Sequence, residues 1–255
     1  MYFIDTHTHL YDEAFAGEED LAVARAIEAG VTRMILPDID SQTRDAMFAL
    51  ADRHEGTLFP CLGLHPTSVD AGWQNEMLLL EKHLDRKIYA IGEIGMDCYW
   101  SKEFIREQEE ALRIQLETAA RMNLPVIIHS RESTELIINI LKDCSHLRLR
   151  GVFHAFSGSV ETYRELQRTG DWYIGIGGVL TYKKASIAET VRQIPLERIL
   201  LETDSPYLTP VPFRGKRNES SYIPHIAGRL AELRGLSQEE VAHTTTENAQ
   251  KLFAI

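Results

Sequence analysis

Short apolar segments alternate with longer amphipathic segments along the whole chain. The short segments are apolar on both faces and often β-branched, which is typical of strands in a parallel sheet that is covered on both sides. We therefore predict eight strands, at residues 2–5, 33–36, 58–63, 88–93, 125–129, 151–154, 173–177 and 199–202.

The amphipathic segments predict helices between these strands. Residues 21–29 end at Gly30, a residue type that commonly terminates helices. Residues 103–122 carry apolar side chains at helical spacing and are followed by Pro125. Further helices are predicted at residues 133–141 and 160–168, and after the capping box of Ser237 and Glu240.

Histidines and acidic residues stand where several predicted strands end. A single histidine at such a place is usually a satisfied core residue, and a single acid usually forms a salt bridge or lies in a turn. Several of them, each at the same end of its own strand, indicate a metal site instead. The candidate ligands are His7, His9, Glu93, His129, His154 and Asp204.

Three of these residues carry an additional argument. His7 and His9 are two residues apart, so in extended backbone both imidazoles face the same side. Glu93 ends an apolar strand, and burying its charge without a partner would cost several kcal/mol. We interpret Glu93 as a carboxylate that bridges two cations.

The origin of the candidate ligands decides between two architectures. Strands that alternate with helices form either a (β/α)8 barrel or a doubly wound sheet. The ligands come from the first, fourth, fifth, sixth and eighth strands, and only a closed barrel brings the first strand beside the eighth. We therefore predict an α/β fold, a (β/α)8 TIM barrel formed by residues 1–255 as a single domain, with its site at the C-terminal ends of the strands.

Composition narrows the functional classes. The formal net charge of -11 argues against a protein that simply coats nucleic acid, but not against an enzyme whose bound cations neutralise phosphate charge. Cys61, Cys98 and Cys144 are far apart and odd in number, which predicts free thiols. We find no signal-peptide pattern and no apolar run of membrane-spanning length. We expect a cytoplasmic protein without a membrane or an obligate protein partner.

Cationic and polar residues follow other strands and suggest an anionic substrate. His65 follows the third strand, and Arg131 follows the fifth. A glycine-containing loop after the eighth strand carries Arg214, Lys216, Arg217 and Asn218. Lys183 and Lys184 add to this charge, although a solvated loop explains them equally well.

Seven motifs over the whole chain resemble those of the TatD family of metal-dependent deoxyribonucleases, which are (β/α)8 proteins related to the amidohydrolases. They are Asp5-Thr6-His7-Thr8-His9, Gly63-Leu64-His65-Pro66, Gly92-Glu93-Ile94-Gly95, His129-Ser130-Arg131, His154-Ala155-Phe156-Ser157-Gly158, Leu201-Glu202-Thr203-Asp204-Ser205-Pro206 and Arg214-Gly215-Lys216-Arg217-Asn218-Glu219. The departures are small: Met96-Asp97-Cys98-Tyr99 replaces a frequent Leu-Asp-Tyr or Leu-Asp-Phe, Ala155 a frequent cysteine, and Ser220 a frequent proline. None falls on a candidate ligand.

The resemblance implies a two-metal hydrolase. One divalent ion would be held by His7, His9, Glu93 and Asp204, and a second by Glu93, His129 and His154. The ions, expected to be Mg, Zn or Mn, would polarise a phosphoryl oxygen and lower the pKa of a bound water. Glu93 and Asp204 would be the catalytic residues, with Asp204 accepting a proton. The expected substrate is DNA, cleaved from single-stranded ends, with its phosphates held by His65, Arg131, Arg214, Lys216, Arg217 and Asn218.

Two other functions fit the same pattern. A binuclear amidohydrolase acting on a small amide, lactone or phosphoester would use the same histidines and aspartate. Many such enzymes carry a carboxylated lysine at the bridging position, where this chain has Glu93. A non-catalytic scaffold would have no physical need for the complete ligand set, and normal function after Asp204→Ala would support it.

Overall fold

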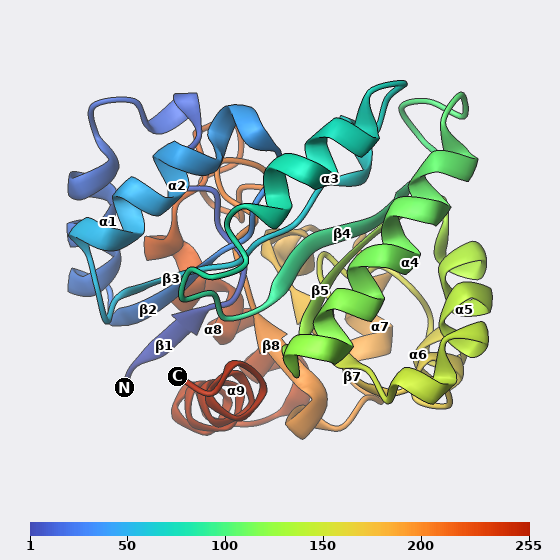
Figure 1. Ribbon diagram of the computed structural model, residues 1–255. Coiled ribbons are helices and arrows are strands. Elements are labelled where there is room, and N and C mark those ends of the chain that lie inside the picture. The colour runs from blue at the N-terminus through green and yellow to red at the C-terminus, as the bar shows by residue number, and fades with distance from the viewer.

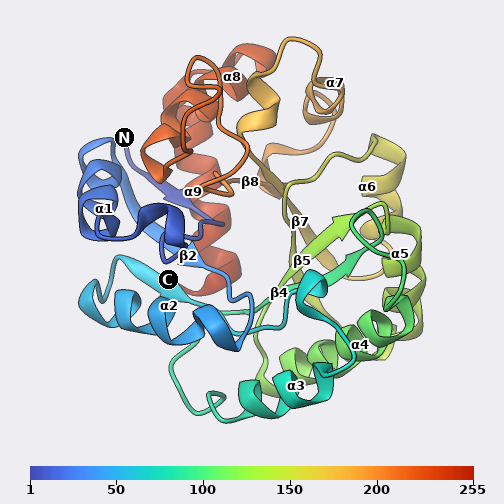
Figure 2. The same cartoon turned by 90° about the horizontal axis from the view of Figure 1, so that it is seen from above.

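The computed structural model describes residues 1–255 and shows parallel strands inside a ring of helices (Figure 1; Figure 2). The strands are β1 Phe3–Asp5, β2 Val31–Leu36, β3 Leu58–Pro60, β4 Ile91–Asp97, β5 Val126–Arg131, β6 Arg150–Phe153, β7 Asp171–Ile176 and β8 Ile199–Leu201. The helices are α1 Glu19–Glu28, α2 Ser41–Arg53, α3 Trp73–Glu81, α4 Ile105–Met122, α5 Thr134–Asp143, α6 Val160–Leu166, α7 Ile187–Val191, α8 Ile223–Arg234 and α9 Gln238–Phe253. None of these helices combines the length and the apolar character that a membrane crossing requires.

Two runs of paired strands, β1-β2-β3 and β4-β5-β6-β7-β8, close into one barrel. Between the segment after β3 and the start of β4, the Leu62 N–H donates to the Ala90 carbonyl at 3.2 Å, and the Gly92 N–H donates to the Leu62 carbonyl at 3.0 Å. Between β1 and β8, the Thr6 N–H donates to the Leu201 carbonyl at 3.0 Å, so the first strand lies beside the eighth. The predicted (β/α)8 barrel is confirmed.

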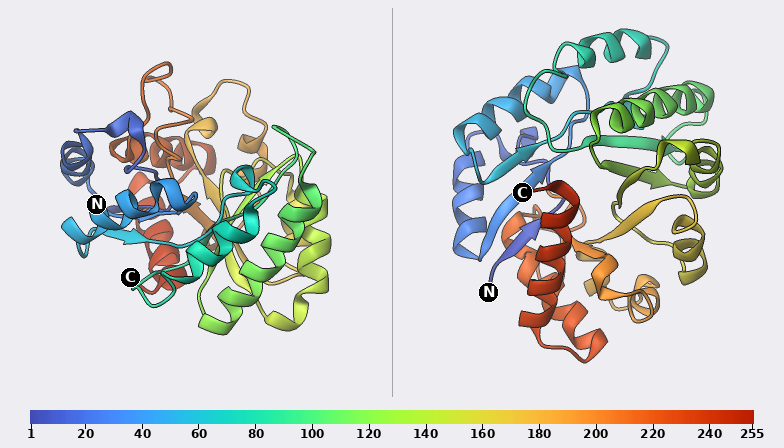
Figure 3. Two further views of the ribbon diagram at one scale, coloured as in Figure 1. Left: turned by 45° about the horizontal axis from the view of Figure 1, so that its top comes forward. Right: turned by 60° about the horizontal axis from the view of Figure 1, so that its bottom comes forward.

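A layer of apolar side chains from or next to every strand fills the N-terminal part of the barrel interior. It comprises Ile4, Ile35, Phe59, Cys61, Ala90, Ile127, Val152, Tyr173 and Leu200. Helix α9 packs Ala249, Leu252 and Phe253 against this layer. The helix therefore closes the end of the barrel where β1 begins, beneath the strands in Figure 1 and in front of them in the right-hand view of Figure 3.

The strand periodicity of two places several ligand-type side chains directly above this layer. His154 comes two residues after Val152, so both side chains point into the barrel. Glu202 has the same relation to Leu200. His129 follows its own layer residue at the same spacing. The C-terminal mouth of the barrel is thus lined by ligand-type side chains, as this fold requires of an active site.

The boundaries of two predicted strands were wrong by three or four residues, and those of the other six differ by one or two. We expected residues 88–93 to form the fourth strand, but β4 begins at Ile91 and continues to Asp97, so Glu93 lies inside the strand. The extension arises because β4 pairs with β5 as far as Arg131, after a register shift between Ile91 and Ile94. The third strand ends at Pro60 instead of residue 63, and beyond it only Leu62 forms an isolated bridge.

Candidate metal centre

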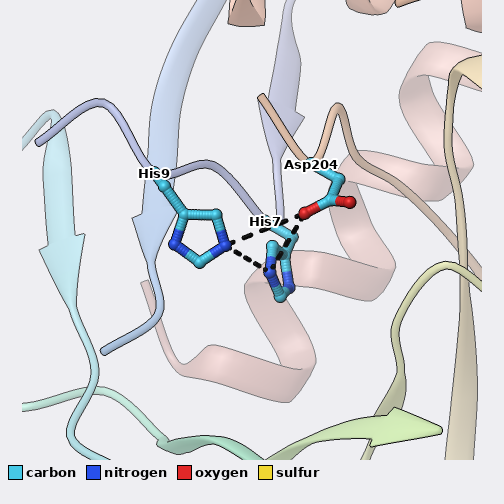
Figure 4. A group of neighbouring side chains, drawn as sticks. All are labelled: His7, His9 and Asp204. Carbon is cyan, nitrogen blue, oxygen red and sulfur yellow. Dashed lines mark hydrogen bonds and ion pairs between the residues drawn. The ribbon is translucent and has the colours of Figure 1, made fainter. Parts of the chain in front are cut away.

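The first group of ligands surrounds one carboxylate oxygen of Glu93. His7 Nε2 lies 3.0 Å and His9 Nε2 3.6 Å from Glu93 Oε2. The two Nε2 atoms are 3.1 Å apart, and each is 3.7 Å from Asp204 Oδ1, as Figure 4 shows. Ligand atoms about 2.0–2.2 Å from one cation lie roughly 3.0–3.5 Å from each other. These distances are close to that range, and His7, His9 and Asp204 together could hold a divalent ion, with Glu93 beside the two imidazoles.

A second group surrounds the other oxygen of the same carboxylate. Glu93 Oε1 lies 2.8 Å from His129 Nδ1, 2.7 Å from His154 Nε2 and 3.2 Å from His65 Nε2. His129 Nδ1 and His154 Nε2 are 3.3 Å apart. We predicted His65 as a substrate contact, and the structure brings it into this group as a candidate ligand. The chemistry of both donor sets fits divalent cations that prefer mixed nitrogen and oxygen ligands.

The position of the proton on His9 follows from its neighbours. Tyr11, buried beside it, donates its hydroxyl proton to the Pro37 carbonyl. The phenolic oxygen then accepts a hydrogen bond from His9 Nδ1, which lies 3.0 Å away. A proton on Nδ1 leaves the lone pair of Nε2 directed at Glu93 and Asp204. Tyr11 thus fixes the tautomer that a metal ligand needs.

His129 is oriented by a carboxylate that our sequence reasoning did not assign. Its Nε2–H donates to Asp97 Oδ2 at 3.0 Å, which leaves the Nδ1 lone pair facing Glu93. Burial opposes the charge of Asp97, but hydrogen bonds from His129, Trp100 and Tyr99 lower its pKa to about 2. Asp97 is therefore ionised and holds the imidazole in its ligating tautomer.

We expect Asp97→Asn to weaken metal binding by roughly 10- to 100-fold. An amide NH2 group facing His129 would donate instead of accepting, which shifts the ring proton to the ligating nitrogen. Calorimetric titration of the metal-free protein with Zn or Mn measures the change. Asp143→Asn, which alters an exposed ion pair with Arg113, is the matched control. Equal metal affinity in both variants would remove Asp97 from the centre.

Burial and charge shift the pKa values of the central groups in opposite directions. Burial lowers the pKa of His9 to about 4 and also lowers that of His65, so both imidazoles are neutral and able to ligate. Burial likewise opposes the charged form of His154, but the negative charge of Glu93 outweighs it and raises that pKa to about 10. Burial raises the pKa of Asp204 to about 7. A buried carboxyl in this state gains from a cation beside it.

Glu202 is a further acid at the mouth that sequence reasoning quoted in a motif but did not assign. It is fully buried; its Oε1 accepts from the Ala155 N–H, whereas Oε2 has no partner. Burial raises its pKa to about 8. Gly175 provides the space, because a Cβ there would lie 1.9 Å from Oε2. The two-residue spacing from Leu200 is the signal that could have identified Glu202.

The predicted substrate contacts are distributed unevenly. Arg131 is exposed and packs on Tyr99, and Arg214 lies over the ring of Tyr182 at 4.4 Å. Lys216 is exposed in the same loop as Arg214. Each of these three side chains is open to solvent and able to meet an anion.

Two other predicted contacts are engaged by the chain itself. Arg217 donates to the Ala14 carbonyl at 2.6 Å and pairs with Glu18 at 2.7 Å. Asn218 is fully buried, and its side-chain amide donates to two backbone carbonyls. The structure does not bring Arg217 or Asn218 to the ligands, because their hydrogen-bonding groups shape the loop that follows β8.

A cavity of about 550 Å³ opens beside the ligands between the loops that follow β6, β7 and β8. Asp204 and Glu202 line it on the side of the metal centre. Its walls combine apolar side chains such as Phe156 and Leu180 with cationic ones. The cationic residues are Lys183, Lys184 and Arg214. The cavity can therefore hold a ligand with an apolar part and a negative charge.

Comparisons with known proteins agree with this geometry. The profile of the TatD related DNase family matches residues 4–254. The metal-dependent hydrolase YabD of Bacillus subtilis (strain 168) is 38% identical, over 98% of each chain. The 3'-5' ssDNA/RNA exonuclease TatD of Pantoea ananatis (strain LMG 20103) is 32% identical, over 98% of this chain and 99% of its own. The crystal structure of the TatD homologue YjjV from Escherichia coli K12 superposes with a TM-score of 0.89 at 32% identity, covering 99% of this chain and 98% of that one.

Proposed function

Because the chain belongs to the TatD family of metal-dependent hydrolases, we propose that it hydrolyses phosphodiester bonds of DNA as an exonuclease on single-stranded ends. Two divalent cations would be bound at the mouth of the barrel. The relative from Pantoea ananatis, named a 3'-5' ssDNA/RNA exonuclease, supports this substrate class. The cations that border the cavity beside the ligands support it independently.

The division of Glu93 between two groups of ligands is the observation that carries the proposal. Its Oε2 faces His7 and His9, and its Oε1 faces His129 and His154. A salt bridge would explain one partner, but it would not explain imidazole nitrogens gathered around both oxygens. A bridging carboxylate between two cations accounts for both sides at once.

The residues of the chain then have separate tasks. His7, His9 and Asp204 would hold one cation, and His129 and His154, with His65 beside them, would hold the other. Bound cations of this kind polarise a phosphoryl oxygen and lower the pKa of water. Asp204, at the edge of the open cavity, accepts the proton of the attacking water. Arg214 holds a phosphate next to the one that is cleaved.

The cationic border of the cavity favours a phosphodiester over a neutral amide or lactone. Lys183 and Arg214 would not be needed to bind an uncharged substrate. The apolar wall around Phe156 suits the sugar or base of a nucleotide. The presence of Glu93, where many binuclear amidohydrolases carry a carboxylated lysine, also favours a phosphodiester substrate.

The test is the degradation of end-labelled single-stranded DNA with added Mg, Mn or Zn, and with a chelator. We expect stepwise shortening that requires a metal and stops when the chelator removes it. A panel of amides and lactones, assayed with the same metal-loaded protein, is the comparison. Hydrolysis of that panel without cleavage of DNA under any metal would overturn the proposal and favour the amidohydrolase function.

A further inference from the structure

Two large aromatic side chains project into solvent from the loop that follows β4. Trp100 is 69% exposed and Tyr99 is 51% exposed. Their rings meet edge to face with centroids 5.0 Å apart. Trp100 is the most exposed large apolar side chain of the chain, whereas Trp73 and Trp172 are 4% and 0% exposed. Two adjacent exposed rings offer a ligand a large, rigid apolar surface with a polar atom at its edge.

Arg131 completes this surface. Its guanidinium lies 3.8 Å from the centroid of the Tyr99 ring and 5.1 Å from that of Trp100. Arg131 forms no ion pair, so its positive charge is available to an anion while its plane is held against the rings. We call Tyr99, Trp100 and Arg131 the aromatic platform.

The aromatic platform is fixed to the metal centre from two sides. Arg131 ends β5 only two residues after the candidate ligand His129. On the other side, Asp97 Oδ1 accepts the backbone N–H groups of Tyr99 and Trp100 at 2.9 and 3.1 Å. The second oxygen of the same carboxylate accepts from His129 at 3.0 Å. One buried acid thus positions both a candidate ligand and the loop that carries the rings.

We propose that the aromatic platform stacks an unpaired base of a single-stranded nucleic acid while the neighbouring phosphodiester lies at the metal centre. This inference rests on the proposed function and specifies the part of the substrate that is recognised. It assigns Tyr99 and Trp100 to base stacking, and Arg131 to the base and its adjoining phosphate.

The chemistry of the surface selects this occupant. Flat exposed rings beside a free guanidinium combine stacking with an attraction for phosphate, which is the usual combination in proteins that bind single strands. In an acidic protein, with a formal net charge of -11, a free arginine next to aromatic rings is a local attraction for an anion. Bases within a duplex already stack on each other, so a single-stranded end meets the platform more readily.

The three tryptophans give the experiment its readout. A base stacked on Trp100 quenches its fluorescence, whereas Trp73 and Trp172 are buried and do not meet the ligand. Oligo(dT) is titrated into the protein with Ca in place of a catalytic metal, and binding is followed by quenching and by anisotropy of a labelled strand. The comparison ligand is an abasic strand with the same number of phosphates.

We expect oligo(dT) to quench the fluorescence and to bind more tightly than the abasic strand. Trp100→Ala should weaken oligo(dT) binding by about 5- to 150-fold and leave the affinity for the abasic strand unchanged. Trp100→Phe should restore part of the affinity. Tyr2→Ala, which removes an aromatic ring of 50% exposure at the other end of the barrel, is the matched control.

Equal affinities for oligo(dT) and the abasic strand in the wild type, or an unchanged oligo(dT) affinity in Trp100→Ala, would overturn the proposal. Oligo(U) tests RNA as a ligand, and we expect it to bind the platform as well because stacking does not involve the sugar. These measurements need no hydrolysis, so they fail independently of the proposed function. Loss of DNA cleavage with base-dependent quenching intact would refute the nuclease alone, and intact cleavage without such quenching would refute the platform alone.

Discussion

Glu93→Gln is expected to reduce metal-dependent hydrolysis by more than about 100-fold. Substitution of a residue that only hydrogen-bonds to a metal ligand already lowers metal affinity or activity by about 10- to 100-fold, and Glu93 is itself a candidate ligand. A carboxylate offers an oxygen lone pair to each side, and Glu93 directs Oε2 at His7 and Oε1 at His154. An amide keeps the shape but presents one oxygen and one NH2 group, so it cannot bridge. We also expect bound metal to fall from two ions to at most one.

Metal content after dialysis and the initial rate of cleavage of a single-stranded oligonucleotide measure these two effects. Glu76→Gln is the matched control, since Glu76 is a partly buried acid that accepts from Ser41 on the outside of the barrel. Thermal unfolding of both variants shows that neither has lost the fold. Two bound ions with wild-type activity in Glu93→Gln would refute the bridge and the mechanism that depends on it.

The fold and part of the ligand cluster could be predicted because both follow from strand periodicity. Once a strand is placed, the residue two positions beyond a buried inward side chain also faces inward, as His154 does after Val152. An error of a few residues in a strand boundary does not change this alternation. Glu93 is an exception, because it lies three residues after the layer residue Ala90, where the register of β4 against β5 shifts.

The supporting acids were harder to predict because their roles depend on residues distant in sequence. Asp97 is defined by its contact with His129, and Glu202 by the space that Gly175 leaves. The helix α2 was not predicted either. Its first turn is capped by Asp40, which accepts the Gln42 N–H, and this local signal could have identified the start of the helix.

In the loop after β8, the sequence predicted more substrate contacts than the structure leaves free. Its cationic composition suggested phosphate binding throughout, but composition does not reveal which side chains the chain itself uses. Arg214 lines the cavity, whereas Arg217 is taken by Glu18 and a backbone carbonyl. Three-dimensional contacts, not residue type, separate a free cation from a structural one.

Gly95→Ala is the second substitution for which we expect a large effect, a loss of roughly 2–6 kcal/mol in the free energy of unfolding. Gly95 has a φ of +144°, a conformation that L side chains rarely adopt. A Cβ there would also lie 2.0 Å from the backbone carbonyl oxygen of His129, its partner in the β4–β5 pairing. Because this neighbour is backbone, β4 and β5 must separate where Glu93 and His129 meet.

Gly56→Ala separates the two causes, since Gly56 has a φ of +82° but no atom within 4 Å of a Cβ. That variant carries only the conformational cost, about 1–2 kcal/mol. Thermal unfolding should therefore show a Tm for Gly95→Ala well below that of Gly56→Ala, and metal titration should show a weakened centre in Gly95→Ala alone. If both variants lost the same free energy of unfolding, the close approach of β4 to the His129 carbonyl would not contribute to the destabilisation. The structural reason for a glycine two residues after Glu93 would then be wrong.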